Sequence, residues 1–230
     1  MAHAVVTEPS FIQRYRANFE HTWNDETSID DVRFVALDSE TTGLDPLTDR
    51  IITIGAVSVV NGEIRIGDSF STLLKVEHNT SAVTVHGVTR DQSIGGVEES
   101  VAVERFLDYL RDGVIVGHHI GHDIAALNVA CERHWGMTLL NRSLDTMDLT
   151  LHLERSGAFA GQAAVRHFTL DALCQKFGVT PHDRHTAVGD AFITAQVFLR
   201  LVRLASNFDR ATLVRICEPF VQIPDTTRAG

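Results

Sequence analysis

FVALDSETTG, residues 34–43, is an apolar run that ends in two carboxylates one residue apart. The apolar part predicts a buried strand. Side chains alternate between the two faces of a strand, so Asp38 and Glu40 should project together from its end. Two neighbouring carboxylates repel each other and are costly to hold together unless a positive charge lies between them. A divalent cation would supply that charge, and the alternative is a strand that runs into a turn with both side chains solvated.

The composition is that of a protein with a sizeable core, because 44% of the 230 residues are apolar. This length predicts one large domain, or one domain with a small appendage. The three cysteines are widely spaced and match neither a zinc site nor a disulfide framework, which favours a reducing compartment. The N-terminus lacks the pattern of a signal peptide, and no apolar run approaches the ~20 residues of a membrane span. We therefore expect a soluble, cytoplasmic protein with no membrane partner.

The formal net charge of −10 bears on possible partners. Nucleic-acid-binding domains are usually basic, so this charge argues against the binding of long duplexes as the main task. It does not exclude an enzyme whose acidic cluster binds metal, because bound cations reverse the local sign of the charge.

The segments around the opening run predict an antiparallel meander. Residues 50–60 are rich in β-branched side chains, and Asn61-Gly62 after them is a strong hairpin turn. Residues 64–76 read as the partner strand, broken near Gly67. Residues 114–117 form a short apolar strand of the kind that is buried in a parallel pairing. Helices are predicted over 97–110, 123–135, 145–153, 169–177 and 186–204, so the class is α/β: an antiparallel three-strand meander plus parallel strands in a mixed sheet, flanked by helices.

Residues 9–24 predict a further helix with one aromatic stripe, because Phe11, Tyr15, Phe19 and Trp23 recur every four residues. Such a stripe either packs on its own domain or forms a partner or dimer surface. The polar and acidic residues 24–31 after it read as a linker.

A second acidic position follows the strand 114–117 in GHHIGHD, residues 117–123. Asp123 would lie near the first turn of the next helix. Ligand sites of open α/β sheets lie at the carboxyl ends of strands, where Asp38 and Glu40 also lie. The alternative for Asp123 is an ordinary helix N-cap. The three histidines of this segment could suggest zinc, but the adjacent His118 and His119 should diverge, and no thiolate supports them.

A third position is HTAVGDA, residues 185–191, at the start of a long helix with an apolar pattern. Asp190 lies on this helix, five residues after His185. With 3.6 residues per turn, the two side chains reach one locus only if His185 lies on the preceding loop. The alternative is an ordinary histidine at a helix start.

These three motifs, Asp-x-Glu-Thr-Thr-Gly, Gly-His-x-x-x-His-Asp and His-x-x-x-x-Asp, occur in this order over residues 34–204. Together they resemble the DEDDh 3′–5′ exonucleases, the superfamily of the epsilon proofreading subunit of bacterial DNA polymerase III. The resemblance implies a ribonuclease-H-like fold, which agrees with the elements predicted above. It also implies that the metal ligands are Asp38, Glu40, Asp123 and Asp190, and that His185 is the general base.

The resemblance further implies contacts to the substrate. The small residues after the first motif would lie just beyond the metals, and HGVT, residues 86–89, looks like the segment against the terminal nucleotide. The expected substrate-binding residues are Ser39, Thr41, Thr42, Gly43, His86, Val88 and His119. Three positions depart from the family pattern, since His119 often is Asn, His122 often is an apolar residue such as Phe, and Ser39 commonly is Thr or an aliphatic residue.

Oxygen ligands without thiolates suit Mg²⁺ or Mn²⁺ as cofactors. Two such ions ~3.5–4 Å apart can clamp the attacking and departing oxygens of a phosphodiester. We expect Asp38 to bridge both ions, with Glu40 and Asp190 on the nucleophile side and Asp123 on the leaving-group side. His185 would accept the proton of the attacking water.

The expected function is a metal-dependent 3′–5′ exonuclease that releases nucleoside monophosphates from single-stranded or frayed DNA ends, with proofreading beside a DNA polymerase subunit as one setting. The direction of cleavage follows from the resemblance alone. One alternative is an oligoribonuclease-like enzyme that trims RNA 3′ ends, since no reader of the 2′-hydroxyl can be located. The other is a non-catalytic nucleic-acid-binding module. The expected organisation is an N-terminal helical extension and linker (1–31), an exonuclease domain (32–206), and a C-terminal helix and tail (207–230).

Overall fold

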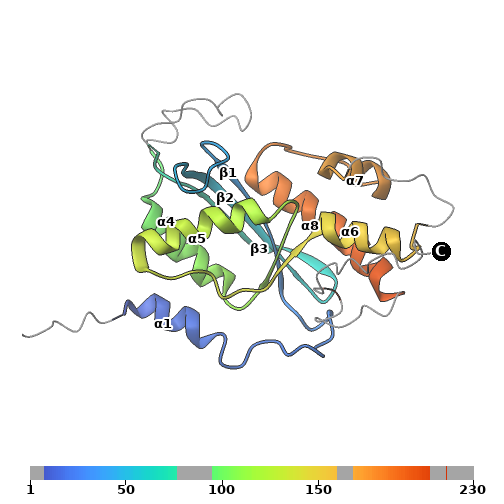
Figure 1. The fold of residues 1–230 in the computed structure, drawn as a ribbon, viewed down its shortest axis with the longest axis horizontal. Helices are drawn as coiled ribbons and strands as arrows, with labels where there is room; N and C mark the ends of the chain where they lie inside the picture. Colours follow the sequence, from blue (N-terminus) through green and yellow to red (C-terminus); the bar gives the residue numbers. More distant parts are fainter. Residues whose placement is uncertain (1–7, 77–94, 160–167, 208–215, 217–230) are drawn as a thin grey trace, which may run out of the picture.

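The protein is described here by a computed structural model that covers residues 8–76, 95–159, 168–207 and 216. Its centre is a five-stranded sheet in the order β3-β2-β1-β4-β5 (Figure 1). β1 (Phe34–Thr41) pairs antiparallel with β2 (Ile51–Val60), and β2 pairs antiparallel with β3 (Glu63–Leu73). The predicted meander is therefore confirmed, as is its break near Gly67, because three residues of β3 (66–68) have no partner between the pairs Ser58–Arg65 and Val57–Ser69.

The other half of the sheet is parallel. β4 (Val114–Gly117) lies beside β1, and β5 (Ser143–Asp145) lies beside β4. The mixed α/β class is thus confirmed. β5 was not expected from the sequence, since three residues are too few to carry a strand pattern.

Alternate residues of β1 belong to two separate cores, one on each face of the sheet. Phe34 and Ala36 pack in the core that also holds buried residues of α6 (Thr146–Arg155), α7 (Leu170–Phe177) and α8 (Ala187–Ser206). Because side chains two apart share a face, Asp38 and Glu40 continue the face that these helices cover.

The opposite face of the sheet is covered by a second set of helices. Val35 and Leu37 of β1 pack there with buried residues of α1 (Ser10–Ala17), α4 (Glu99–Leu110) and α5 (Gly121–Trp135). Figure 1 shows α4 and α5 on the side away from α6, α7 and α8. β1 is therefore buried on both faces, which explains its continuous apolar run.

The aromatic helix α1 is shorter than predicted and ends at Ala17 rather than near residue 24. The side-chain amide of Asn18 donates to the carbonyls of Arg14 and Tyr15, which satisfies the helix end. Phe11 and Tyr15 are buried, and the Tyr15 hydroxyl bonds the side-chain oxygen of Asn141. Packing on its own domain is thus confirmed for this helix, and the expectation of a partner surface is wrong for these two side chains.

Several expectations fall on residues that the structure does not describe. His86 and Val88 lie outside the described residues, and only Asn207 and Ile216 of the predicted C-terminal helix and tail lie within them. Among the helices in the described ranges, none has the length and apolar character needed to cross a membrane.

Candidate active site

The end of β1 meets the start of α8 because β2 has a glycine between them. Gly55 is the partner of Asp38 in the β1–β2 register. A Cβ atom on Gly55 would lie 2.3 Å from the backbone carbonyl carbon of Ala187, so any side chain would push α8 away. The glycine therefore lets the first turn of α8, with Asp190, approach the carboxylates of β1.

Three carboxylates meet at this point. Asp38, Glu40 and Asp190 each offer an oxygen atom, and these atoms all lie within 4.8 Å of one another. Asp190 is buried, whereas the other two are half-buried. A compact set of carboxylate oxygens without a thiolate fits a hard divalent ion such as Mg²⁺ or Mn²⁺.

Asp123, the fourth predicted ligand, approaches from the other face of the sheet. It is buried in the first turn of α5, where Ile120 occupies the N-cap position. Its Oδ1 accepts hydrogen bonds from the Ser39 amide at 2.8 Å and from the Ser39 hydroxyl at 2.6 Å. The alternative of a simple N-cap is therefore wrong. Asp123 lies outside the group of three, but its charge is one of the causes that raise the pKa of Asp38.

The carboxylates strongly affect one another's protonation. Burial, and then the charges of Asp123, Asp190 and Glu40, raise the pKa of Asp38 well above its usual range. Burial raises the pKa of Glu40 to about 7, with Asp190 and Asp123 adding to the effect. Burial also raises the pKa of Asp123 to about 6, against the hydrogen bonds from Ser39. The cluster thus favours protons or other cations over a fully ionised state.

This electrostatic strain makes a testable prediction about stability. The pKa of Glu40 is higher in the folded chain, about 7, than its ordinary value of 4.5, so the folded chain binds this proton more tightly. Stability from this group is therefore present below about pH 4.5 and is lost as the pH rises through 7, by roughly 1–2 kcal/mol after allowance for partial exposure. The unfolding free energy can be measured by urea titration in EDTA at several pH values from 5 to 8. Between these two pH values it should fall less in Glu40→Gln than in the wild type. Parallel pH dependences of the two proteins would contradict it.

His185 lies on the loop that precedes α8, as the motif spacing predicted. Thr186 is the N-cap of α8, and its hydroxyl accepts from the Gly189 amide. His185 has a φ of 63° and its backbone amide donates to Asp190 Oδ2 at 3.2 Å. The residue before the helix thus turns back over the carboxylate, which leaves the exposed imidazole beside the cluster.

These residues line an open cavity of about 300 Å³. It contains the three clustered carboxylates together with Ser39, two histidines from the turn after β4, and the loop before α8. The lining residues are Asp38, Ser39, Glu40, His118, His119, Thr169, Leu170, Arg184, His185 and Asp190. The cavity thus brings together residues of all three sequence motifs.

His119 is held at the cavity by Asp145. His119 has a φ of 59°, a left-handed conformation that is uncommon outside glycine. Its amide and that of Ile120 both donate to the Asp145 carboxylate, at 3.2 and 3.0 Å. The same carboxylate accepts from the Met147 amide at 2.8 Å as the N-cap of α6. Asp145 therefore fixes the turn that carries His119.

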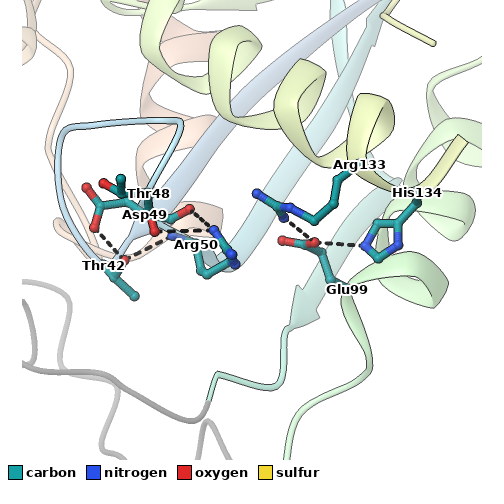
Figure 2. Close-up of polar contacts among 7 residues, drawn as sticks. All are labelled: Thr42, Thr48, Asp49, Arg50, Glu99, Arg133 and His134. Carbon is teal, nitrogen blue, oxygen red and sulfur yellow. Dashed lines mark hydrogen bonds and ion pairs between the residues drawn. The ribbon is translucent and has the colours of Figure 1, made fainter. Parts of the chain in front are cut away.

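The residues after the first motif are used within their own loop. The Thr42 hydroxyl donates to Asp49 at 2.8 Å and accepts from the Arg50 amide at 3.0 Å (Figure 2). The Thr41 hydroxyl donates to the Gly43 carbonyl at 2.7 Å. These bonds hold the loop in one shape beside the carboxylates, and contact of Thr41, Thr42 and Gly43 with a substrate stays a prediction.

Figure 2 also shows a group of ion pairs between α4 and α5. The carboxylate of Glu99, at the start of α4, lies between Arg133 and His134 of the last turn of α5 (Figure 2). The distances from Glu99 Oε2 are 2.5 Å to Arg133 and 2.8 Å to His134. These pairs join α4 to α5, and the Arg133 and His134 contacts hold the pKa of Glu99 below its usual value despite its burial.

Arg184, which the sequence motifs did not single out, is the one arginine or lysine among the described residues that line the cavity. Its Nη1 lies 2.5 Å from Asp190 Oδ1, and its Nε lies 2.7 Å from Asp171 Oδ1. The available signal was a positive residue directly before His185 in the third motif.

A family model described as exonuclease, RNase_T, matches residues 35–198. A DNA polymerase III PolC-type protein of Thermotoga maritima is 34% identical over 79% of the chain, and a DNA polymerase III subunit epsilon-like protein of Rhodobacter capsulatus is 36% identical over 77%. The chain spans only 13% of the first relative and 25% of the second.

Solved structures share the fold. Escherichia coli exonuclease I in complex with a dT13 oligonucleotide has a TM-score of 0.66 at 17% identity, over 78% of this chain and 43% of that one. The cell-death related nuclease CRN-4 has a TM-score of 0.64 at 16% identity, over 76% of this chain and 65% of that one. At these identities the likeness concerns the fold alone.

Proposed function

The chain belongs to the RNase_T exonuclease family, and from this premise we propose that it removes nucleotides from the 3′ end of single-stranded DNA by metal-dependent hydrolysis. The observation that carries the proposal is the group of Asp38, Glu40 and Asp190 in one cavity with His185. A binding module would not need clustered carboxylates whose pKa values are raised by burial and, in addition, by their mutual repulsion.

The chain's residues divide the work between metal binding and proton transfer. Asp38, Glu40 and Asp190 would hold one divalent ion, and Asp123, across β1, would assist with a second. When bound, such ions lower the pKa of the attacking water and neutralise the charge on the departing oxygen. The hydrogen bonds from Ser39 keep the Asp123 carboxylate in one orientation toward the cluster.

His185 would accept the proton of the attacking water. Its imidazole is exposed beside the carboxylates, and its backbone is fixed through the bond from its amide to Asp190. A general base needs to reach the attacking water, and this position beside the carboxylates is compatible with that.

The size of the cavity supports cleavage at a chain end. At about 300 Å³ it lies at the small end of the range for ligand cavities, roughly 300–1,000 Å³, and so suits one terminal nucleotide better than the middle of a duplex. The net charge of −10 also disfavours a long duplex.

DNA is the substrate that the relatives favour. Two relatives are named as DNA polymerase III proteins, and the exonuclease I structure contains a dT13 oligonucleotide. We include in the proposal a role in proofreading, beside a polymerase subunit in the cytoplasm. The chain spans only 13% of the PolC-type relative. A polymerase partner therefore does not follow from the cleavage chemistry and needs a test of its own.

A matched set of labelled oligonucleotides tests polarity and sugar preference together. Single-stranded DNA and RNA of one sequence, labelled at either end, should be incubated with the chain and Mn²⁺. A 5′-labelled DNA should give a ladder that shortens stepwise, a 3′-labelled DNA should release labelled mononucleotide at once, and RNA should react more slowly. Internal cuts, or release of mononucleotide from the 5′ end, would contradict the proposal. Faster cleavage of RNA than of DNA would show that RNA, and not DNA, is the preferred substrate.

A further inference from the structure

Arg184 is held at two points inside the carboxylate cavity. One nitrogen pairs with Asp190 Oδ1 at 2.5 Å, and another donates to Asp171, in the first turn of α7, at 2.7 Å. The second oxygen of Asp190 accepts from the His185 amide. Both oxygens of this predicted metal ligand therefore have a partner within the chain, Oδ1 in an ion pair and Oδ2 in a hydrogen bond.

The loop around Arg184 is built to hold this position. Asp183 and His185 on either side of it both have left-handed backbones, with φ of 52° and 63°. The Thr186 hydroxyl donates to the Asp183 carbonyl at 2.7 Å, which closes the turn. Non-glycine residues in this conformation carry strain, and they persist only where the surrounding contacts hold them. The two ion pairs of Arg184 are such contacts.

The guanidinium is a permanent positive charge, because arginine does not lose its proton in proteins. It lines the same cavity as Asp38 and Glu40, and its charge acts on both carboxyl groups against the effect of their burial. Arg184 thus does for the cluster part of what a bound cation would do.

We propose that Arg184 is a built-in counter-cation that competes with the divalent ion for Asp190 and thereby sets the metal affinity of the cluster. This inference rests on the metal site of the proposed function. It makes Arg184 a positioning residue, which acts on the reaction through Asp190. Without its guanidinium, the carboxylates would attract a divalent ion more strongly, by on the order of tenfold in the dissociation constant for one charge at this range.

Calorimetric titration of Mn²⁺ into the full chain, stripped of metal with a chelator and dialysed, tests the proposal without any substrate. Arg184→Gln should bind Mn²⁺ about tenfold more tightly than the wild type. Arg184→Met, which keeps the apolar stem, should do the same and serves if the first variant does not fold. Arg14→Gln is the control, because it removes an equally charged side chain from an ion pair with Asp108, on α1 and α4.

Different results would contradict the role of Arg184 and the proposed metal-dependent function. Equal or weaker Mn²⁺ binding by the Arg184 variants would overturn the inference and leave the metal site in place. Equal tightening by Arg14→Gln would also overturn it, because the effect would then be one of net charge. Absence of Mn²⁺ binding in the wild type and in every variant would contradict the metal site, and with it the proposed function.

Discussion

Replacing Asp38 with asparagine is expected to lower the rate of exonuclease cleavage by at least about 10³-fold, because the central carboxylate of the cluster loses its charge while keeping its shape. Asp38 lies in the second half of β1, and one of its carboxylate oxygens lies within 4.8 Å of oxygens of Glu40 and Asp190. Its pKa is raised well above the ordinary value by burial and by three neighbouring carboxylates, so its charge opposes folding at neutral pH. The variant should therefore be inactive and melt no lower than the wild type. Initial rates on 5′-labelled DNA and a thermal melt in EDTA at pH 8 measure both.

A matched substitution away from the cavity shows whether the loss of rate comes from removing any carboxylate or from removing one of the cluster. Asp31→Asn removes one exposed carboxylate before β1 and should leave the rate within about twofold of the wild type, as surface substitutions usually do. If Asp38→Asn retained a tenth of the wild-type rate at saturating Mn²⁺, the cluster would not be the metal centre of the reaction.

Replacing His185 with glutamine should lower the rate by about 10²- to 10⁴-fold through the loss of the general base. The fold should be unaffected, because the contact of this residue with Asp190 uses the backbone amide and not the ring. Loss of a general base should also change how the rate at saturating Mn²⁺ depends on pH, because a base acts only in its deprotonated form. Rates between pH 5.5 and 8 should therefore depend less on pH in His185→Gln than in the wild type.

His182→Gln is the control for this prediction, since it changes an exposed histidine three residues earlier on the same loop. It should keep both the rate and the pH profile of the wild type. A fully active His185→Gln with an unchanged profile would remove His185 from the mechanism.

The parts of the site that the sequence predicts are those with a local pattern. Asp38 and Glu40 share a face because β1 pairs with β2 in one register as far as Glu40, so a period of two is enough to place them. The five-residue spacing of His185 and Asp190 required a loop histidine, and the structure has one. Both depend only on the geometry of a single element.

The rest depends on contacts between distant elements. The position of α8 is set by the missing side chain of Gly55, and nothing around that glycine in β2 reveals which helix will cross it. Arg184 pairs at the same time with Asp190 and with Asp171 of α7, a contact between distant segments that the sequence does not reveal. The N-terminal helix ends at Ala17 since Asn18 bonds its last carbonyls, although the aromatic spacing continues to Trp23. Tertiary packing decides these features, and it leaves no periodic trace in the sequence.

We propose that the carboxylates in the second half of β1 form, with Asp190, a divalent metal site. Crystals of the chain can be soaked in Mn²⁺ and measured at the manganese absorption edge. We expect an anomalous difference peak bounded by Asp38, Glu40 and Asp190, which is absent from crystals of Asp190→Asn. A wild-type crystal with no peak there, or with its only peak beside His118 and His119, would contradict it.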